Sequence, residues 1–230
     1  AGGRLASPSS AFVAVAADKQ ACAERLAAAG VPTPDAARLE ADAALPADFP
    51  YPAVVKPIDG AGSQDTHVVN HAADRPPAYA WPRRLERFVP GVAASVGVLG
   101  DGGGRLWPLP ACRQRLSSDG RLAYLGGETP LAAGLARRAE RLATDAVRAI
   151  GPLVGYAGVD LVLGDDPDGA ADAVIEINPR LTTSCVGLRR VLSRGGLLTP
   201  MLAAARGETP AIEATDRPLG FDADGAVYWL

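Results

Sequence analysis

Two apolar segments with oxygen-bearing side chains at alternate positions limit what this chain can fold into. Residues 158–163 have the sequence Gly-Val-Asp-Leu-Val-Leu, and residues 174–180 have the sequence Val-Ile-Glu-Ile-Asn-Pro-Arg. Residues 164–169 between them are rich in the turn formers Gly, Asp and Pro. This pattern predicts two neighbouring antiparallel strands joined by a polar loop.

Alternation along these strands gathers acidic side chains on one face of a sheet. Asp160 points away from its apolar neighbours, and Glu176 shares a face with Asn178. The opposite face carries Ile175 and Ile177. Two carboxylates close together on a half-buried sheet are unfavourable unless a cation or a proton compensates. A few hard oxygen ligands favour Mg²⁺ or Mn²⁺ with a phosphate substrate over a closed calcium site, while the simpler alternative is a pair of edge-strand charges facing water.

Length and composition exclude several classes of protein. A chain of 230 residues can form one large domain or two intimate lobes. Its net charge of -3 and the absence of a basic run argue against a nucleic-acid surface. No long apolar stretch or signal-peptide pattern occurs, so we expect a soluble, cytoplasmic protein. The unpaired spacing of the three cysteines predicts reduced thiols, and two histidines are too few for a multi-histidine metal site.

The basic residues are 21 arginines and only two lysines, Lys19 and Lys56. Lys19 follows Asp18, a good N-cap for an alanine-rich helix, so it lies in the first turn, where free N–H groups favour an anion. Lys56 ends a short buried-type strand at 53–57 and precedes a glycine loop at 59–65 whose amides could cover phosphates. This is not a P-loop, because the lysine precedes the glycines. Base composition of the gene is the alternative explanation for the scarcity of lysine.

The remaining pattern completes an α+β fold, because strands and helices are interspersed without an internal repeat. Proline and glycine divide the chain into short elements, and a Pro-Gly pair marks a hinge. We expect strands at 67–69, 94–99 and 106–115, a strand-like hinge segment at 85–91, and helices at about 135–150 and after residue 184.

These motifs occur in an order that resembles the ATP-grasp superfamily. They are Asp18-Lys19 before a helix ending in Gly30-Val31-Pro32, then Val54-Val55-Lys56-Pro57 with its glycine loop, then Glu86-Arg87-Phe88-Val89-Pro90-Gly91, and finally Asp160 with Glu176-Ile177-Asn178. The resemblance implies two α+β lobes with ATP between them, one at 1–87 and one at 88–230. It also implies that the N-terminal domain usual in that superfamily is largely absent from this chain.

The resemblance further implies a role for each matching residue. ATP and Mg²⁺ (or Mn²⁺) are the implied cofactors. Phosphate contacts are implied for Lys19 and Lys56, a mobile flap for residues 60–64 including Gly60, Gly62 and Ser63, adenine contacts for Glu86, Phe88 and Val89, metal ligation for Asp160, Glu176 and Asn178, and support of the transferring group for Arg180.

More narrowly, residues 155–161 and 176–189 resemble the subgroup that contains tyramine–glutamate ligase of methanofuran biosynthesis. Two positions depart from patterns common among relatives: Ala93 replaces an acid that would contact ribose, and Gly158 replaces an arginine. Arg113 and Arg115 are therefore candidates for neutralising phosphate. The expected substrate pocket includes Arg180, Thr182, Thr183 and Arg189.

The implied activity is ATP-dependent ligation of a carboxylate to an amine through an acyl phosphate. Small-molecule acid and amine substrates are the expected partners, with a homodimer as a candidate assembly and with neither nucleic acid nor membrane. Three alternatives remain open at this stage. They are another amino-acid or peptide ligase or a carboxylating enzyme, a nucleotide-binding module without ligase activity, and a plain α+β structural protein.

Overall fold

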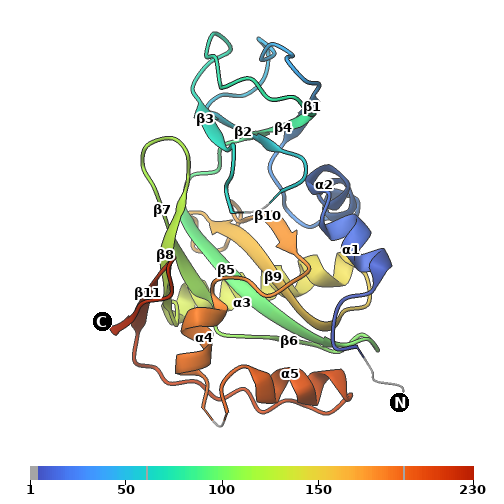
Figure 1. Cartoon of the computed structure of the whole chain (residues 1–230), viewed down its shortest axis with the longest axis vertical. Coiled ribbons are helices and arrows are strands. Elements are labelled where there is room, and N and C mark those ends of the chain that lie inside the picture. The colour runs from blue at the N-terminus through green and yellow to red at the C-terminus, as the bar shows by residue number, and fades with distance from the viewer. Residues whose placement is uncertain (1–4, 61, 194) are drawn as a thin grey trace.

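The computed structural model describes residues 5–60, 62–193 and 195–230, and it contains two antiparallel sheets (Figure 1). The smaller sheet has the strand order β1-β4-β2-β3. The larger sheet has the order β10-β9-β5-β7-β8-β11-β12, with β6 paired to β5. The α+β class is therefore confirmed. The strands are β1 (Ala36–Leu39), β2 (Ala53–Pro57), β3 (His67–Val69), β4 (Arg83–Arg87), β5 (Val92–Asp101), β6 (Leu106–Pro108), β7 (Cys112–Leu116), β8 (Tyr124–Thr129), β9 (Val154–Leu163), β10 (Ala173–Asn178), β11 (Leu219–Asp222) and β12 (Val227–Trp229).

Alternation in the smaller sheet separates an apolar face from a charged one. Val55 and Leu85 pack in its hydrophobic core. Lys56 and Glu86, one position further along β2 and β4, meet on the other face, where their side chains form an ion pair. That charged face is turned toward the larger sheet, so the small sheet supplies the candidate site with charge.

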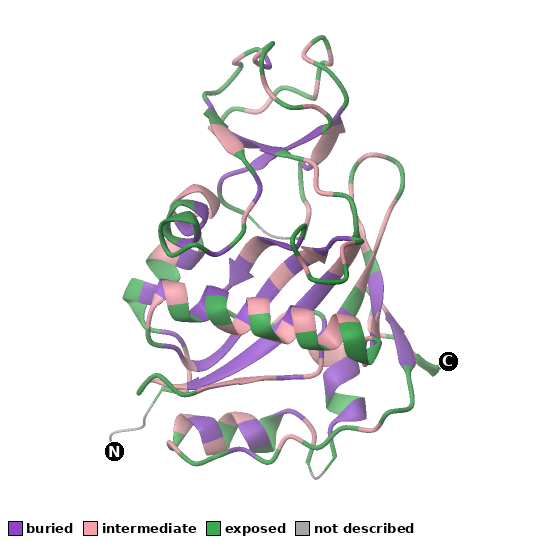
Figure 2. Cartoon of the chain, turned by 180° about the vertical axis from the view of Figure 1, so that it is seen from behind, coloured by how far each residue is buried: buried purple, intermediate pink, exposed green. Residues whose placement is uncertain are grey.

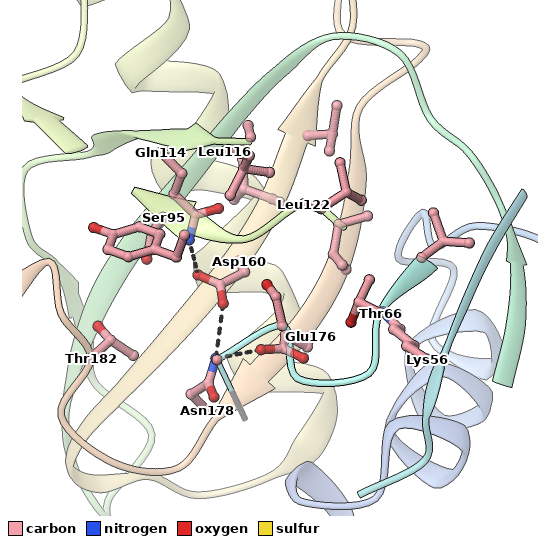
Figure 3. Close-up of a pocket in the computed structure, with 18 of the residues that line it drawn as sticks. Lys56, Thr66, Ser95, Gln114, Leu116, Leu122, Asp160, Glu176, Asn178 and Thr182 are labelled. Carbon is pink, nitrogen blue, oxygen red and sulfur yellow. Dashed lines mark hydrogen bonds between the residues drawn. The ribbon is translucent and has the colours of Figure 1, made fainter. Parts of the chain in front are cut away.

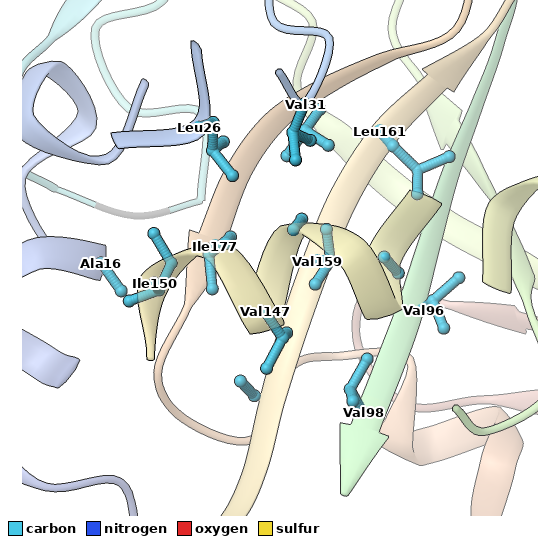
Figure 4. Close-up of a cluster of buried hydrophobic side chains, with 14 of the residues drawn as sticks. Ala16, Leu26, Val31, Val96, Val98, Val147, Ile150, Val159, Leu161 and Ile177 are labelled. Atoms are coloured by element: carbon cyan, nitrogen blue, oxygen red, sulfur yellow. The ribbon is translucent and has the colours of Figure 1, made fainter. Parts of the chain in front are cut away.

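Helices cover one face of the larger sheet. They are α1 (Ser10–Ala16), α2 (Lys19–Ala28) and α3 (Ala133–Ile150). Buried residues of α3 such as Ala139, Ala143 and Val147 recur at intervals of four and face the sheet, while its other side is exposed (Figure 2). Together with Val159 and Ile177 from the strands they form the main core (Figure 4). This core fixes the position of β9 and β10.

The N-terminal helices belong to this core as well. Ala16 of α1 and Leu26 of α2 are buried in it (Figure 4). They therefore pack against the larger sheet, although their residues precede the smaller sheet in sequence. The division into lobes at 1–87 and 88–230 stays a prediction.

The opposite face of the larger sheet is covered over only part of its length. Helices α4 (Cys185–Val191) and α5 (Leu198–Ala205) lie over one end, and a second core forms there around Leu99, Tyr156, Leu188 and Phe221. The remaining part of this face, around Asp160, is turned toward the smaller sheet. The fold thus leaves the acidic strands facing the lysine-bearing sheet.

Most of the expected elements are confirmed, with one division. The strand expected at 106–115 is two strands, β6 and β7, separated by three residues. Pro108 and Pro110 explain the break, because proline has no N–H for a ladder. The segment at 85–91 is strand only as far as Arg87, after which Phe88 and the following residues connect the two sheets.

Three further expectations concern single features. Within the described residues, no helix combines the length and apolar character needed to cross a bilayer. Cys22, Cys112 and Cys185 are all free thiols, as expected. Ala61 of the expected flap lies outside the described residues.

Candidate functional site

A cavity of about 480 Å³ lies between the two sheets, and it is lined by most of the candidate site residues. Basic and acidic side chains therefore face the same space, which the two sheets enclose (Figure 3). The candidate residues that line the cavity are Lys19, Lys56, Gly60, Gly62, Ser63, Glu86, Phe88, Val89, Arg113, Asp160, Glu176, Asn178 and Arg180.

The two acidic side chains are direct neighbours across paired strands. Asp160 of β9 stands opposite Glu176 of β10 in the antiparallel register. The amide nitrogen Nδ2 of Asn178 donates hydrogen bonds to Asp160 Oδ2 at 3.0 Å and to Glu176 Oε1 at 3.1 Å (Figure 3). The amide thus bridges the two carboxyl groups, as the shared face in the sequence predicted.

A β-bulge interrupts the alternation of side chains along β10. The register shifts between Val174 and Glu176, so Val174 and Ile177 both lie in the main core. Ile175 lines the cavity beside Glu176, and its expected placement on the core face is therefore wrong. A bulge inserts an extra residue opposite one partner residue and so reverses the alternation locally.

The pair of carboxyl groups is electrostatically asymmetric. Burial, followed by the neighbouring charge of Glu176, raises the pKa of Asp160 to about 7. Burial also acts to raise the pKa of Glu176, but the positive charges of Lys56 and then Lys19 outweigh it and lower that pKa. The distance from Lys19 Nζ to Glu176 Oε2 is 3.6 Å. Glu176 is therefore the charged member, and Asp160 is the one that most needs a compensating proton or cation.

The available donors fit a hard divalent cation with open coordination positions. Two carboxylates and one amide oxygen offer oxygen ligands only, which suits Mg²⁺ or Mn²⁺. Among the described residues, no group of three or more His, Cys, Asp or Glu side chains is arranged to hold a metal ion, so a closed cage is not formed. Asn178 Oδ1 accepts a hydrogen bond from Arg180 Nη2 at 3.2 Å, so the Asn178 amide must turn to offer this oxygen to a cation.

Lys56 is held by a buried charge network within the smaller sheet. Its Nζ lies 2.6 Å from Glu86 Oε1, and Arg84 Nε lies 3.0 Å from Glu86 Oε2. Arg84 Nη1 also donates to Gln20 Oε1 at 2.6 Å. Glu86 therefore orients both Lys56 and Arg84, one with each of its oxygens. A contact between Glu86 and adenine stays a prediction.

Lys19 connects the start of α2 to the glycine loop. Asp18 caps the helix, because its Oδ1 accepts from Gln20 N at 2.8 Å and from Ala21 N at 2.9 Å. Lys19 is the first helical residue, as expected, and its Nζ donates to the carbonyl oxygen of Gly60 at 2.9 Å. The lysine is thereby directed into the cavity.

The glycine loop itself depends on left-handed backbone. Gly60 has φ +115° and Gly62 has φ +71°, values that glycine adopts readily. Ser63, with φ 57°, shares this region. All three residues line the cavity, which agrees with a loop that covers a ligand.

The arginine candidates separate into two groups. Arg180 lines the cavity and bonds Asn178, and the exposed Arg113 also lines it. Arg115 is directed elsewhere, since its Nη2 donates to Phe221 O at 3.1 Å and pairs with Asp222. Arg189 lies exposed on α4 and is not among the described residues that line the cavity.

Two polar residues beside Asp160 were not predicted from the sequence. Gln114 Nε2 donates to Asp160 Oδ1 at 2.8 Å, and Ser95 is buried in β5 directly opposite Asp160 (Figure 3). Ser95 could have been recognised as a lone hydroxyl in an apolar strand. A glutamine in a short polar strand gives no comparable signal.

Comparisons with known proteins agree with this arrangement. The model of the ATP-grasp domain family matches residues 16–184. Tyramine–L-glutamate ligase of Methanocaldococcus fervens is 34% identical over 114 residues, covering 50% of this chain and 36% of that protein. The match thus spans about a third of the length of this curated relative.

Solved structures show the same fold. N5-carboxyaminoimidazole ribonucleotide synthetase from Thermotoga maritima has a TM-score of 0.72 at 20% identity, over 93% of this chain and 55% of that one. L-amino acid ligase from Bacillus licheniformis has a TM-score of 0.72 at 20% identity, over 91% and 54%. With a family match over most of its length and the same fold in these structures, the chain belongs to the ATP-grasp domain family.

Proposed function

We propose that this chain carries the active site of an ATP-dependent carboxylate–amine ligase. One observation carries the proposal: Lys19 and Lys56 line the same cavity as the acidic pair Asp160 and Glu176. Two lysines and an acidic cation site that border one cavity match a nucleotide whose phosphates need neutralisation. Membership of the ATP-grasp domain family supports the same conclusion.

Each wall of the cavity has a distinct task in this proposal. Lys19 and Lys56 bind phosphate oxygens, and the loop at residues 60–64 covers them. The hinge residues Phe88 and Val89 lie beside the base. Asp160, Glu176 and Asn178 would hold Mg²⁺ or Mn²⁺, which neutralises phosphate charge when bound.

The proposed reaction has two steps. An oxygen of the substrate carboxylate attacks the γ-phosphorus of ATP, the bond to the β–γ bridging oxygen breaks, and ADP leaves. The amine nitrogen then attacks the acyl carbon, inorganic phosphate leaves, and the nitrogen loses a proton to give the amide. Arg180 steadies the transferring group, with Arg113 as a second cation near the phosphates. The protein supplies position and charge, so no nucleophilic side chain is needed.

L-glutamate and tyramine are the substrate pair we propose first, within methanofuran-type cofactor biosynthesis in the cytoplasm. The identity to a protein named tyramine–L-glutamate ligase supports this choice. A ligase for other amino acids or peptides is the second candidate, favoured by the fold shared with an L-amino acid ligase. Thr182 and Thr183 line the cavity beside Arg180 and belong to the proposed substrate pocket.

Release of ADP across a panel of acids and amines tests the proposal. We expect release only when ATP, Mg²⁺, an acid and an amine are all present. Phosphate release that is independent of both substrates would contradict it. Tight ATP binding without product from any pair would favour a nucleotide-binding module, and failure of ATP to raise the melting temperature would favour a structural protein.

A further inference from the structure

The Asp160 carboxyl group is held from both sides by amide groups. Gln114 Nε2 donates to its Oδ1 at 2.8 Å, and Asn178 Nδ2 donates to its Oδ2 at 3.0 Å (Figure 3). Asn178 comes from the neighbouring strand β10. Gln114 comes from β7, which is separated from β9 by β5, so its side chain reaches across an intervening strand.

Ser95 belongs to β5, the strand over which Gln114 reaches. It stands directly opposite Asp160 in the register, on the cavity side of a strand whose residues Ala94 and Val96 face the main core. Only 2% of Ser95 is exposed, and its Oγ lies outside ideal hydrogen-bond geometry within the described residues, although its hydroxyl acts to lower the pKa of Asp160. A small side chain here leaves room beside the contact between Gln114 and Asp160, and its hydroxyl is a second donor for the site.

We infer that Gln114 is a positioning residue that orients Asp160 for cation binding, with Ser95 as a secondary donor. Carboxylates that ligate a metal ion are typically held by a hydrogen bond from a neighbouring donor. By bonding Oδ1, Gln114 fixes the rotation of the carboxyl group. Oδ2 is then left on the side of Asn178 and Glu176, where the proposed cation would lie.

This inference rests on the proposed cation site, but the identity of the acid and the amine does not affect it. Partners of metal-ligating carboxylates typically change metal affinity by 10–100-fold when they are removed. Such a partner acts on cation binding before it acts on the chemical step. Its effect is therefore visible without turnover.

The experiment measures binding of Mn²⁺ to the whole chain by electron paramagnetic resonance, in the presence of a non-hydrolysable ATP analogue. Gln114→Met keeps the length and shape of the side chain and removes the amide. We expect the affinity for Mn²⁺ to fall about 10-fold or more, with a smaller loss for Ser95→Ala. Leu109→Met is the control, because Leu109 is fully buried in the second core and does not line the cavity.

Turnover supplies an independent readout. In Gln114→Met, the Mg²⁺ concentration for half-maximal rate should rise by a larger factor than kcat falls. Mn²⁺ affinity within twofold of wild type would overturn the inference, as would a loss of kcat with unchanged Mg²⁺ dependence. The proposed function fails separately, if wild type binds Mn²⁺ and nucleotide but no acid and amine pair stimulates ADP release.

Discussion

The two sheets that border the cavity differ in how their buried charged side chains are paired. In the smaller sheet, Glu86 is paired with both Lys56 and Arg84, and all three are buried. In the larger sheet, Asp160 and Glu176 are side by side, and the nearest cation, Lys19 Nζ, is 3.6 Å from Glu176. In these groups of charges, the smaller sheet thus contributes two cationic side chains and one carboxylate, whereas the larger sheet contributes two carboxyl groups.

This difference shows in which part of the site the charges are paired by groups of the protein itself. The network around Lys56 satisfies its own charges, so it can present a lysine to an anion without rearrangement. The acidic pair is satisfied only in part, since the pKa of Asp160 is raised to about 7 by burial and by Glu176. Asp160 in the larger sheet is therefore left in need of a proton or a cation, and each prediction below perturbs one side of the comparison.

The largest expected effect comes from Glu176→Gln. Removing the charged member of the acidic pair should lower kcat by about 10²–10³-fold, the usual loss when one preorganised electrostatic group is removed. ADP release at saturating ATP and Mg²⁺ measures this. Glu40→Gln changes an exposed glutamate outside the cavity and serves as the control. Retained kcat in Glu176→Gln would remove the residue from the cation site.

Lys56→Met should affect stability as well as binding. Among the described residues, it leaves Glu86 with Arg84 as its one cationic partner, and breaking a buried pair costs about 3 kcal/mol in the free energy of unfolding. Chemical denaturation without ligand measures this cost, and calorimetry measures the accompanying loss of ATP affinity. Lys19→Met is the comparison: Lys19 bonds a loop carbonyl and approaches Glu176 only to 3.6 Å, so we expect its loss to weaken ATP binding with less destabilisation. Equal destabilisation by the two changes would contradict the contrast between the sheets.

Asp160→Asn should change how stability depends on pH in the absence of divalent cations. Because the folded-state pKa of Asp160 is raised to about 7, its protonated form stabilises the folded protein. That stabilisation is complete below the unfolded pKa of about 3.9 and is lost as the pH rises through about 7. The variant lacks this loss, so its unfolding free energy relative to wild type should increase between about pH 4 and about pH 7. A difference that stays constant or shrinks would show that the Asp160 environment has been misjudged.

The smallest effect is expected for Gly62→Ala in the glycine loop. A side chain at φ +71° costs about 1 kcal/mol, although nothing lies within 4 Å of the added Cβ. Gly225→Ala, at φ +95° and outside the cavity, carries similar strain and is the matched control. Calorimetry should detect weaker ATP binding only in Gly62→Ala, and equal ATP affinity in both variants would argue against the loop covering the phosphates.

Local patterns predicted much of this site from the sequence. Alternation placed Asp160, Glu176 and Asn178 on one face, and the N-cap at Asp18 placed Lys19 in the first helical turn. Each of these depends on a few consecutive residues. The bulge that turns Ile175 into the cavity has no such signal, because it arises from pairing with β9.

Contacts between distant segments explain the rest. Gln114 reaches Asp160 only because β7 and β9 both flank β5, and Arg84 is directed to Glu86 by the geometry of the smaller sheet. The resemblance to the family had made Arg115 and Arg189 candidates. Their side chains are placed away from the cavity by the strand and the helix that carry them. Sequence alone thus predicted the residue types better than their partners.

Anomalous diffraction from crystals grown with Mn²⁺ and a non-hydrolysable ATP analogue tests the central claim most directly. We predict Mn²⁺ bound by oxygens of Asp160 and Glu176, with the phosphates of the analogue extending toward Lys19 and Lys56. Mn²⁺ on other side chains, or an analogue bound outside the space between the two sheets, would contradict the account.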